Sequence, residues 1–345
     1  MLIALPVLSG SCATSGTEYP AGPPAGESEG SVWVSGSSTV APISAFVADE
    51  FNYNGSPASI TVDDPGTGDG FALFCDGVIE VAGASRPVKA EELEQCAANG
   101  IEPIELEVAL DGITVLTSAA NDDVTCLAFA DLYALLGPEA EGVERWSEAS
   151  ELAAELGSTT ELPDAALEVT APGTESGTYD AFVELVVADL AEARVEEGEL
   201  DADQAESLRE DYSSQADDNS IIAGIEGSHH SLGFVGFAFA EGAGDGVREL
   251  AVDGGDGCVS PSVDTIADAT YPIARSLYIY VSADAAADDP AVREYVDYFL
   301  LDISLQDLVA EAGYVPLPAE RIEDTRQRWA SRTTGSDHAT ATVTA

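Results

Sequence analysis

Residues 32–51 read VWVSGSSTVAPISAFVADEF, and this stretch places a strand directly before a helix. The opening VWVSG has the apolar, β-branched character of a buried strand. The segment that follows has apolar residues at helical spacing, a proline in its first turn, and Ser38 or Thr39 in position to cap it. We therefore predict a strand followed by a helix over residues 40–51.

The same alternation of strand and helix continues along the chain, which favours an α/β fold with a mostly parallel sheet covered by helices. Strand-like segments precede helices over residues 59–76 and again over residues 78–100. Residues 101–121 carry two strand-like runs, and we expect the second run to leave the first lobe. Residues 268–281 read as a β-rich return. We expect two lobes with a ligand cleft between them.

These two crossings set the domain boundaries that we expect. One lobe comprises residues 31–117 together with 272–320, and the other comprises residues 118–271. Residues 321–345 are polar and rich in threonine, so we expect them to form a polar tail that frays.

The composition is that of a folded but very acidic protein. The 345 residues include 45% hydrophobic ones, enough for buried cores, and 64 Asp and Glu against 12 Lys and Arg. The formal net charge of -52 is spread along the chain, which favours a hydrated, halophilic surface over a local partner-binding face. A charge of this sign argues against nucleic acid and anionic membrane surfaces as partners.

Four of the five cysteines lie in the folded part of the sequence, at positions 75, 96, 126 and 258. They favour two disulfides in an oxidising compartment, and Cys75–Cys96 with Cys126–Cys258 is the simplest of the possible pairings. A zinc site is the alternative. It is less favoured because no two of these cysteines have CxxC spacing, and we expect no metal.

The chain starts with MLIALPVLSGSCATSG, an apolar run followed by small residues and a cysteine. This pattern resembles the end of a lipoprotein signal peptide, so we expect residues 1–12 to be a signal segment and Cys12 to carry a lipid anchor. No basic residue precedes the run, and Ser9 stands where that pattern prefers leucine. Residues 13–30 have the composition of a flexible tether. Membrane contact is expected through that anchor alone.

Three loops rich in glycine and small hydroxyl residues each precede a helix-like segment: SGSSTVAPI at 35–43, GASRPVKAEE at 83–92 and GTESGTYDAF at 173–182. A helix N-terminus presents unpaired backbone N–H groups and the positive end of its dipole, so it can hold an anion without a nearby lysine. Ordinary capping would explain any one of these loops. All three in one chain favour a small anion bound in the cleft.

The motifs of this chain resemble those of the PstS family, the phosphate-binding proteins of ABC-type phosphate uptake. The resemblance rests on GSSTVAPI (36–43), GTGDGFALFC (66–75), ASRP (84–87) and SGTYDAF (176–182), and it extends over residues 31–318. It implies a two-lobed, periplasmic-binding-protein-like fold of type II that closes over phosphate outside the cytoplasm and delivers it to a membrane permease. It also implies a monomer with no catalytic activity and no cofactor.

Carried over residue by residue, the resemblance implies that phosphate is held by donors from both lobes. The first lobe contributes Ser38, Thr39 and Thr67, and the second contributes Ser176, Gly177 and Thr178. Further candidates beside these positions are Gly68, Asp69, Ser85 and Glu175, and Asn219 is a separate residue that could approach the cleft.

Two positions depart from the better-known members of that family. Arg86 stands where those members carry an aspartate, and Pro172 stands where they carry an arginine. We hypothesise that Arg86 supplies the missing positive charge through a bidentate guanidinium contact with the anion. A structural salt bridge is the alternative for this arginine. The missing aspartate leaves the basis of discrimination against sulfate open.

Other functions stay open on the sequence alone. The nearest is binding of another oxyanion, such as sulfate, molybdate or tungstate. A phosphatase or hydrolase acting through Ser38 or Ser176 is less favoured, because no Ser–His–acid arrangement is visible. His229 and His230 are expected to be exposed in one turn, and Arg209 is a further residue that could approach the cleft.

Overall fold

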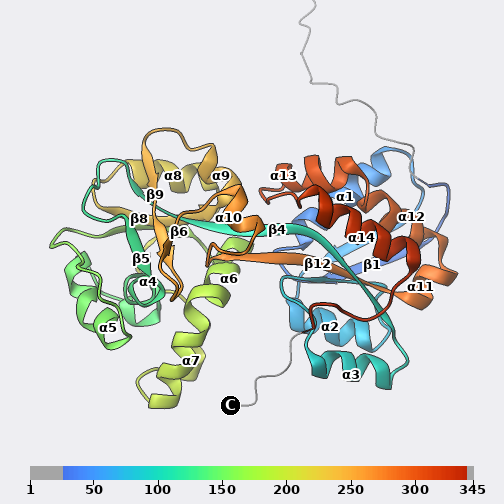
Figure 1. The fold of residues 1–345 in the computed structure, drawn as a ribbon, viewed down its shortest axis with the longest axis horizontal. Helices are drawn as coiled ribbons and strands as arrows, with labels where there is room; N and C mark the ends of the chain where they lie inside the picture. Colours follow the sequence, from blue (N-terminus) through green and yellow to red (C-terminus); the bar gives the residue numbers. More distant parts are fainter. Residues whose placement is uncertain (1–25, 340–345) are drawn as a thin grey trace, which may run out of the picture.

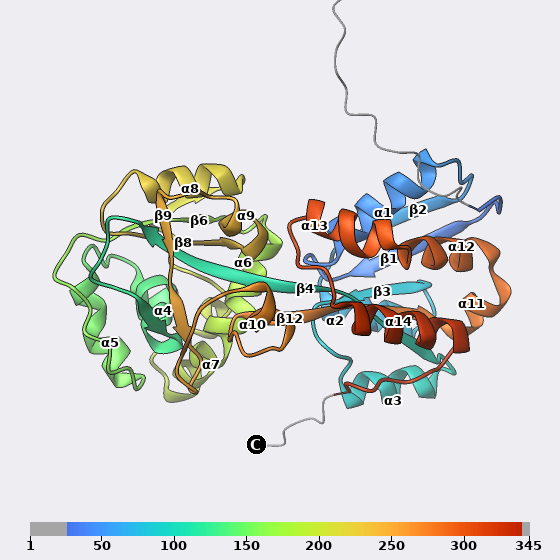
Figure 2. The same cartoon turned by 45° about the horizontal axis from the view of Figure 1, so that its top comes forward.

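The computed structural model describes residues 26–339, which form two α/β lobes side by side (Figure 1). Strands β4 and β12 run between the lobes, and Figure 2 shows the same division from a second direction. The predicted two-lobed α/β architecture is confirmed. The predicted signal segment, Cys12 and residues 13–25 of the predicted tether lie outside the described residues.

The first lobe is built on a mixed sheet with the strand order β2-β1-β3-β12-β4. β2 and β3 run parallel to β1, whereas β12 runs antiparallel to both β3 and β4. The bounds of these strands are β1 Ser31–Gly36, β2 Ser59–Asp63, β3 Val81–Ala84, β4 Pro103–Ser118 and β12 Ala274–Ser282. Because the three parallel strands end at one edge of the sheet, the loops that follow them meet there.

Helices cover both faces of this sheet (Figure 2). α1 contacts β1 and α12 on one face, while α2 contacts β3 and α3 on the other. Ile43, Val47 and Phe51 of α1 are spaced four residues apart and are buried against the sheet, as an amphipathic helix requires. The bounds are α1 Ala41–Tyr53, α2 Thr67–Cys75, α3 Ala90–Ala98, α11 Ala283–Asp288, α12 Pro290–Phe299, the π-helical η5 Ile303–Leu308, α13 Val309–Glu311 and α14 Ala319–Ser331.

The two crossing strands are hydrogen-bonded neighbours. β12 pairs with residues 103–112 of β4, and from Ile113 onward β4 pairs with β8 and β9 of the second lobe. The two predicted runs over residues 101–121 form one strand of 16 residues, all of them buried, and its second half leaves the first lobe as expected. Asp111 and Gly112, residue types that are uncommon inside strands, lie in the middle of this strand.

The second lobe continues the same sheet. From β4 the strand order is β8-β6-β7, with β6 parallel to both neighbours, and a separate three-stranded sheet has the order β11-β10-β5. The strand bounds are β5 Cys126–Ala128, β6 Glu168–Pro172, β7 Ser213–Gln215, β8 Ser231–Gly236, β9 Val247–Glu249, β10 Ala251–Asp253 and β11 Cys258–Val259. The helix bounds are α4 Phe129–Leu136, α5 Ser150–Glu155, α6 Gly177–Phe182, α7 Ala188–Glu197, α8 Asp218–Glu226, α9 Phe237–Glu241 and α10 Val263–Ala267, with short turns η1 Pro138–Ala140, η2 Trp146–Ala149 and η4 Ala202–Gln204.

One long helical segment faces the first lobe. α6 runs directly into a π-helical stretch, η3 (Val183–Val187), and then into α7. The Oγ of Ser176 caps α6 by accepting a hydrogen bond from the backbone N–H of Thr178 at 3.2 Å. Phe182 stacks on Phe234 of β8 with ring centroids 4.1 Å apart, which fixes this helix to the sheet of its own lobe.

The described C-terminal residues, up to 339, are packed on the first lobe, whereas a polar tail that frays was predicted over residues 321–345. α14 packs on β4 and buries Ile322, Thr325 and Trp329. Beyond the helix, the backbone N–H of Gly335 donates to the carbonyl of Pro103 at 2.8 Å. The polar composition was misleading because only one face of this helix is apolar. Residues 340–345 lie outside the described residues.

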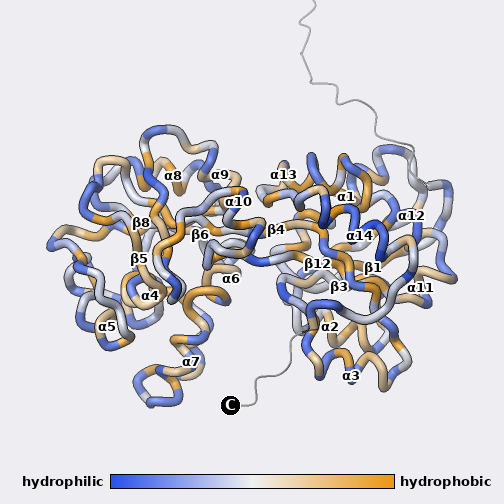
Figure 3. Tube along the Cα trace, viewed as in Figure 1, coloured by the Kyte–Doolittle hydropathy of each residue, from blue (hydrophilic) through white to orange (hydrophobic). Residues whose placement is uncertain are grey.

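Both predicted disulfides are present, one in each lobe. Cys75–Cys96 joins the end of α2 to α3, and Cys126–Cys258 joins β5 to β11. Figure 3 shows hydrophobic residues along the strands inside the lobes and hydrophilic residues on outer loops and helix ends. The acidic residues are therefore mostly on the surface, while the cores have ordinary apolar packing.

Candidate functional site

A cavity of about 540 Å³ lies between the two lobes. Loops of the first lobe, the α6–η3 helix of the second lobe and strand β12 contribute to its walls. The lining residues are Ser37, Ser38, Thr39, Pro65, Gly66, Thr67, Gly68, Asp69, Ser85, Arg86, Asp180, Glu184, Glu206 and Arg275. Seven residues predicted for an anion site thus share one cavity: Ser38, Thr39, Thr67, Gly68, Asp69, Ser85 and Arg86.

The first-lobe part of the cavity is formed by the loops after β1, β2 and β3. Thr67 and Ser85 come from two of these loops, and their hydroxyl oxygens lie 3.1 Å apart. The backbone N–H of Ser85 also donates to Oγ1 of Thr67 at 3.3 Å. The strands β2 and β3, which flank β1 and run parallel to it, therefore bring together hydroxyl groups that are 18 residues apart in the sequence.

Glycines allow these loops to approach closely. Gly66 has φ +109°, a conformation that side chains rarely adopt, and it immediately precedes α2. A Cβ on Gly70 would lie 2.5 Å from the Cα of Gly36, so α2 could not sit this close to the end of β1 with any larger residue. The N-terminus of α2 consequently faces the cavity at Thr67, with no side chain capping it.

Ser38 and Thr39 do not cap α1, contrary to the sequence prediction. The helix begins at Ala41 without a side-chain cap. Ser38 instead donates its hydroxyl to Oδ2 of Asp180 at 2.7 Å, and Thr39 accepts from Nη2 of Arg275 at 3.0 Å. Both hydroxyl groups are therefore directed to partners around the cavity and away from the backbone of their own helix.

Arg275 is the cavity arginine that the sequence analysis missed. Its side chain is only 8% exposed, and its Nε lies 3.3 Å from Oδ2 of the equally buried Asp111 on β4. Nη1 contacts the carboxylate of Glu184 from the second lobe. Burial raises the pKa of Asp111, and Arg275 offsets only part of that rise. A charged residue in the apolar run YPIARSLYIYV was the signal that could have identified it.

Arg86 lies on the cavity wall, but its guanidinium is already engaged. Nη1 and Nη2 donate to the two carboxylate oxygens of Glu92 at 2.9 and 2.7 Å. Burial alone would lower the pKa of Arg86, and the contact with Glu92 more than reverses this. The geometry agrees with the salt-bridge alternative for Arg86 and leaves Arg275 as the better candidate for balancing the charge of an anion.

The second-lobe motif packs against the first loop of the first lobe beside the cavity. A Cβ on Gly177 would lie 3.2 Å from the backbone oxygen of Ser38 and 3.3 Å from the Cα of Thr39. Ser176 and Thr178 lie beside this contact, outside the lining set, and the residue of the motif that does line the cavity is Asp180. Its position at the N-terminal turn of α6 explains why it faces Ser38.

Other candidate residues lie away from the cavity. Glu175 and Asn219 are not among its lining residues, and Arg209 is buried in the second lobe, where it pairs with Asp211 at 2.6 Å. The expectation that Arg209 approaches the cleft is therefore wrong. His229 and His230 contact each other at the surface, and no group of side chains suited to a metal ion occurs within residues 26–339.

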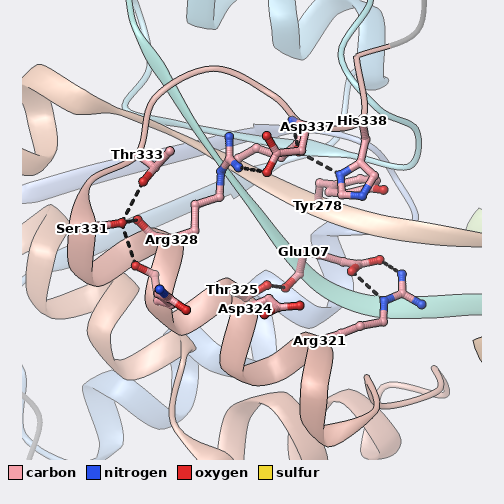
Figure 4. Close-up of a pocket in the computed structure, with 12 residues that line it drawn as sticks. Glu107, Tyr278, Arg321, Asp324, Thr325, Arg328, Ser331, Thr333, Asp337 and His338 are labelled. Atoms are coloured by element: carbon pink, nitrogen blue, oxygen red, sulfur yellow. Dashed lines mark hydrogen bonds and ion pairs between the residues drawn. The ribbon is translucent and has the colours of Figure 1, made fainter.

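A second cavity, of about 450 Å³, lies between α14 and strands β4 and β12 (Figure 4). Its polar side chains contact one another: Arg321 pairs with Glu107, Arg328 pairs with Asp337, and the ring of His338 lies within hydrogen-bonding distance of Glu105. The contacts with Glu107 and Glu105 fasten the C-terminal segment to β4, and the Arg328–Asp337 pair lies within that segment. A structural role is therefore the better account of this cavity.

Comparison with known proteins gives the class of the chain. Residues 21–302 match the profile of the PBP superfamily domain. Protein SphX of Synechococcus elongatus is 37% identical over 308 residues, which cover 88% of this chain and 83% of SphX. The phosphate-binding protein PstS of Staphylococcus aureus is 30% identical over 284 residues, which cover 82% of this chain and 77% of PstS. The crystal structure of a possible phosphate binding protein from Planctomyces limnophilus is 32% identical, with a TM-score of 0.77 over 88% of this chain and 98% of that one.

The chain therefore belongs to the PBP superfamily and, within it, to the PstS family of phosphate-binding proteins. Proteins of this family bind solutes and are not enzymes, so the hydrolase alternative is set aside. The geometry agrees with this. Ser38 donates to Asp180, Ser176 accepts from the backbone N–H of Thr178, and neither serine contacts a histidine. Within the described part of the chain, no helix combines the length and apolarity needed to cross a bilayer.

Proposed function

We propose that the chain binds inorganic phosphate in the cavity between its lobes and delivers it to the permease of an ABC transporter. The observation that carries this proposal is the convergence of hydroxyl groups from three first-lobe loops on a cavity that also contains the buried Arg275. The Staphylococcus aureus relative, a phosphate-binding protein, supports the same ligand.

The first lobe would supply most of the donors for such an anion. A dehydrated phosphate presents four oxygen atoms that need hydrogen-bond donors in place of water. The hydroxyl groups of Ser38, Thr39, Thr67 and Ser85 and the backbone N–H groups at the start of α2 are donors of the right kind. Arg275 would supply the positive charge, and its contacts with Asp111 and Thr39 orient the guanidinium before the anion arrives.

The second lobe would close the site through Ser176, Gly177 and Thr178. Gly177 already lies against Ser38 and Thr39, so the backbone of this turn is within reach of the first loop. Closure of the lobes would exclude water and strengthen each contact with the anion. Arg86 and Asp69 would then shape the outer part of the cavity, with Arg86 held by Glu92.

We place this function outside the cytoplasmic membrane, where a permease would receive the phosphate. The two disulfides support this location, because such bonds persist in oxidising compartments. A lipid anchor at Cys12 would keep the protein near its permease. The monomeric state and the adaptation of the acidic surface to salt remain predictions from the sequence.

Isothermal titration of the purified chain with phosphate tests the proposal directly. We expect one phosphate per chain, with sulfate, molybdate and tungstate binding much more weakly under the same conditions. The titrations are best run in about 1 M salt, where the Debye length is about 3 Å and the acidic surface no longer repels the ligand. If another oxyanion binds saturably and phosphate does not bind, that anion and not phosphate is the ligand of this cavity.

A further inference from the structure

The cavity proposed for phosphate has an unusual balance of charge for an anion site. Two arginines and four carboxylates line it, the carboxylates being Asp69, Asp180, Glu184 and Glu206. A carboxylate that approaches a bound anion without a proton between them repels it. The lining therefore raises the question of what these acidic groups contact.

Two of the four carboxylates hold donors that phosphate would need. Asp180 accepts the hydroxyl hydrogen of Ser38 at 2.7 Å, and Glu184 accepts from Nη1 of Arg275. The two acids are four residues apart on the continuous α6–η3 helix, so they project from the same face. Both contacts join the second-lobe helix to groups on the first lobe and the crossing strand.

These contacts and a phosphate contact exclude each other at Ser38. A serine hydroxyl has a single hydrogen to donate, so it can serve Asp180 or a phosphate oxygen but not both. At Arg275 the competition is for charge: its Nε, Nη1 and Nη2 each donate one hydrogen, to Asp111, Glu184 and Thr39, and the carboxylate of Glu184 occupies the Nη1 edge that a phosphate oxygen would approach. Charge-assisted hydrogen bonds of this kind are among the stronger ones in proteins, so displacing them has a measurable cost.

We propose that Asp180 and Glu184 are affinity-determining residues that compete with phosphate for Ser38 and Arg275. This inference rests on the proposed phosphate function. On binding, phosphate replaces the two carboxylates as the acceptor for these donors. On release, the carboxylates take the donors back, so neither the hydroxyl nor the guanidinium is left without an acceptor. The exchange lowers affinity and eases the transfer of the ligand.

The test compares Asp180→Asn and Glu184→Gln with the unaltered chain in phosphate titrations. Each change keeps the shape of the side chain and removes the charge that strengthens its hydrogen bond. We expect each variant to bind phosphate about tenfold more tightly. In a Ser38→Ala background, Asp180→Asn should give no such gain, because the contested hydroxyl is absent.

Glu206→Gln is the matched control. Glu206 lines the same cavity and carries the same charge, but it makes no hydrogen bond to Ser38 or Arg275. Its effect reports repulsion alone, and it should be small in about 1 M salt. Thermal unfolding of every variant checks that these exposed side chains leave the fold unchanged.

Three outcomes would overturn the inference while leaving the proposed function intact. One is unchanged affinity in both variants, and another is an equal gain in Glu206→Gln, which would reduce the effect to repulsion. The third is weaker binding, which would mean that a carboxylate contacts phosphate itself. If the unaltered chain and all variants fail to bind phosphate, the proposed function fails and this inference fails with it.

Discussion

Arg275 donates from Nη2 to Oγ1 of Thr39 at 3.0 Å, and this contact joins the return strand β12 to the first loop of the cavity. The two residues are 236 positions apart in the sequence. Because Nε of the same guanidinium faces Asp111 on β4, the arginine is held by both crossing strands and by the first lobe together. Its place at this junction makes it the cation on which we expect phosphate binding to depend.

Replacing Arg275 should damage phosphate binding far more than replacing Arg86. Arg275→Ala removes a charge-assisted donor, and we expect about a hundredfold weaker binding in a calorimetric titration. Arg86→Ala should change affinity little, because that guanidinium is bound to Glu92. Arg275→Lys keeps the charge that balances Asp111 and controls for loss of folding. A larger loss of phosphate affinity in Arg86→Ala than in Arg275→Ala would show that Arg86, and not Arg275, balances the charge of the anion.

The hydroxyl of Thr67 should contribute to binding without being needed for folding. Thr67→Val removes the hydroxyl and keeps the shape, so we expect about tenfold weaker phosphate binding. Thr61→Val makes the same change on the exposed side of β2, outside the cavity, and should leave affinity unaltered. Equal affinities for the two variants would remove Thr67 from the site.

Glu139 should stabilise the fold in a pH-dependent way. Burial raises the pKa of Glu139, but hydrogen bonds from Arg194 and Tyr133 outweigh it and leave the pKa below its usual value. Glu139→Gln should therefore lower the free energy of unfolding by about 2 kcal/mol at neutral pH. The difference in free energy of unfolding between the two chains should be complete above about pH 4.3, the pKa of a glutamate in the unfolded chain. It should disappear as the pH falls through the lower pKa that Glu139 has in the folded chain. Denaturant unfolding at several pH values measures it, and a difference that grows on acidification would contradict the assignment.

The two disulfides should differ in what they contribute to stability. Cys126–Cys258 links residues 132 positions apart, whereas Cys75–Cys96 links residues 21 apart. Loop-closure entropy then gives about 5 kcal/mol for the first bond and about 3 kcal/mol for the second. Paired Cys→Ala variants, compared by denaturant unfolding, test the order. A greater loss for Cys75→Ala with Cys96→Ala would show that local packing outweighs loop length.

Helix α14 should be part of the folded core. Trp329 is buried against the sheet side of this helix and donates its Nε1 to Asp297 at 2.5 Å. Trp329→Ala should therefore lower the free energy of unfolding by about 3 kcal/mol. Glu323→Ala, on the exposed side of the same helix, is the control and should have little effect. Equal stability of both variants would support a frayed C-terminus.

Features that depend on neighbouring residues in the chain were predictable from the sequence. The strand and helix around Ser38, the hydroxyl-rich loops and the alternation of elements follow local patterns. The loops after three parallel strands meet at one edge of a sheet. Much of the first-lobe cavity could therefore be predicted from the sequence without knowing which distant residues are in contact. The same local patterns could not distinguish a capping hydroxyl from one directed into a cavity.

Features that depend on distant contacts were not predictable in this way. Arg86 pairs with Glu92 six residues away, whereas the sequence suggested only that a structural salt bridge was an alternative and did not identify its partner. Arg275 finds Thr39 and Asp111 far along the chain, and no local pattern identifies either partner. Residues 101–121 were likewise predicted to form two strand-like runs and not one strand. A charged Asp111 is stable in the middle of a buried strand only because the distant Arg275 pairs with it, and the sequence does not show that pairing.

The pairing of β4 with β12 has a mechanical consequence for how the lobes move. Two strands bonded edge to edge resist bending within their own plane but yield readily to twisting along their length. A paired ribbon of this kind would favour one direction of relative lobe rotation, a twist about the strands. Two separate, unpaired connecting segments would allow rotation in many directions. Each opening should therefore return along the same arc, and the two halves of the cavity should meet in the same alignment on every cycle.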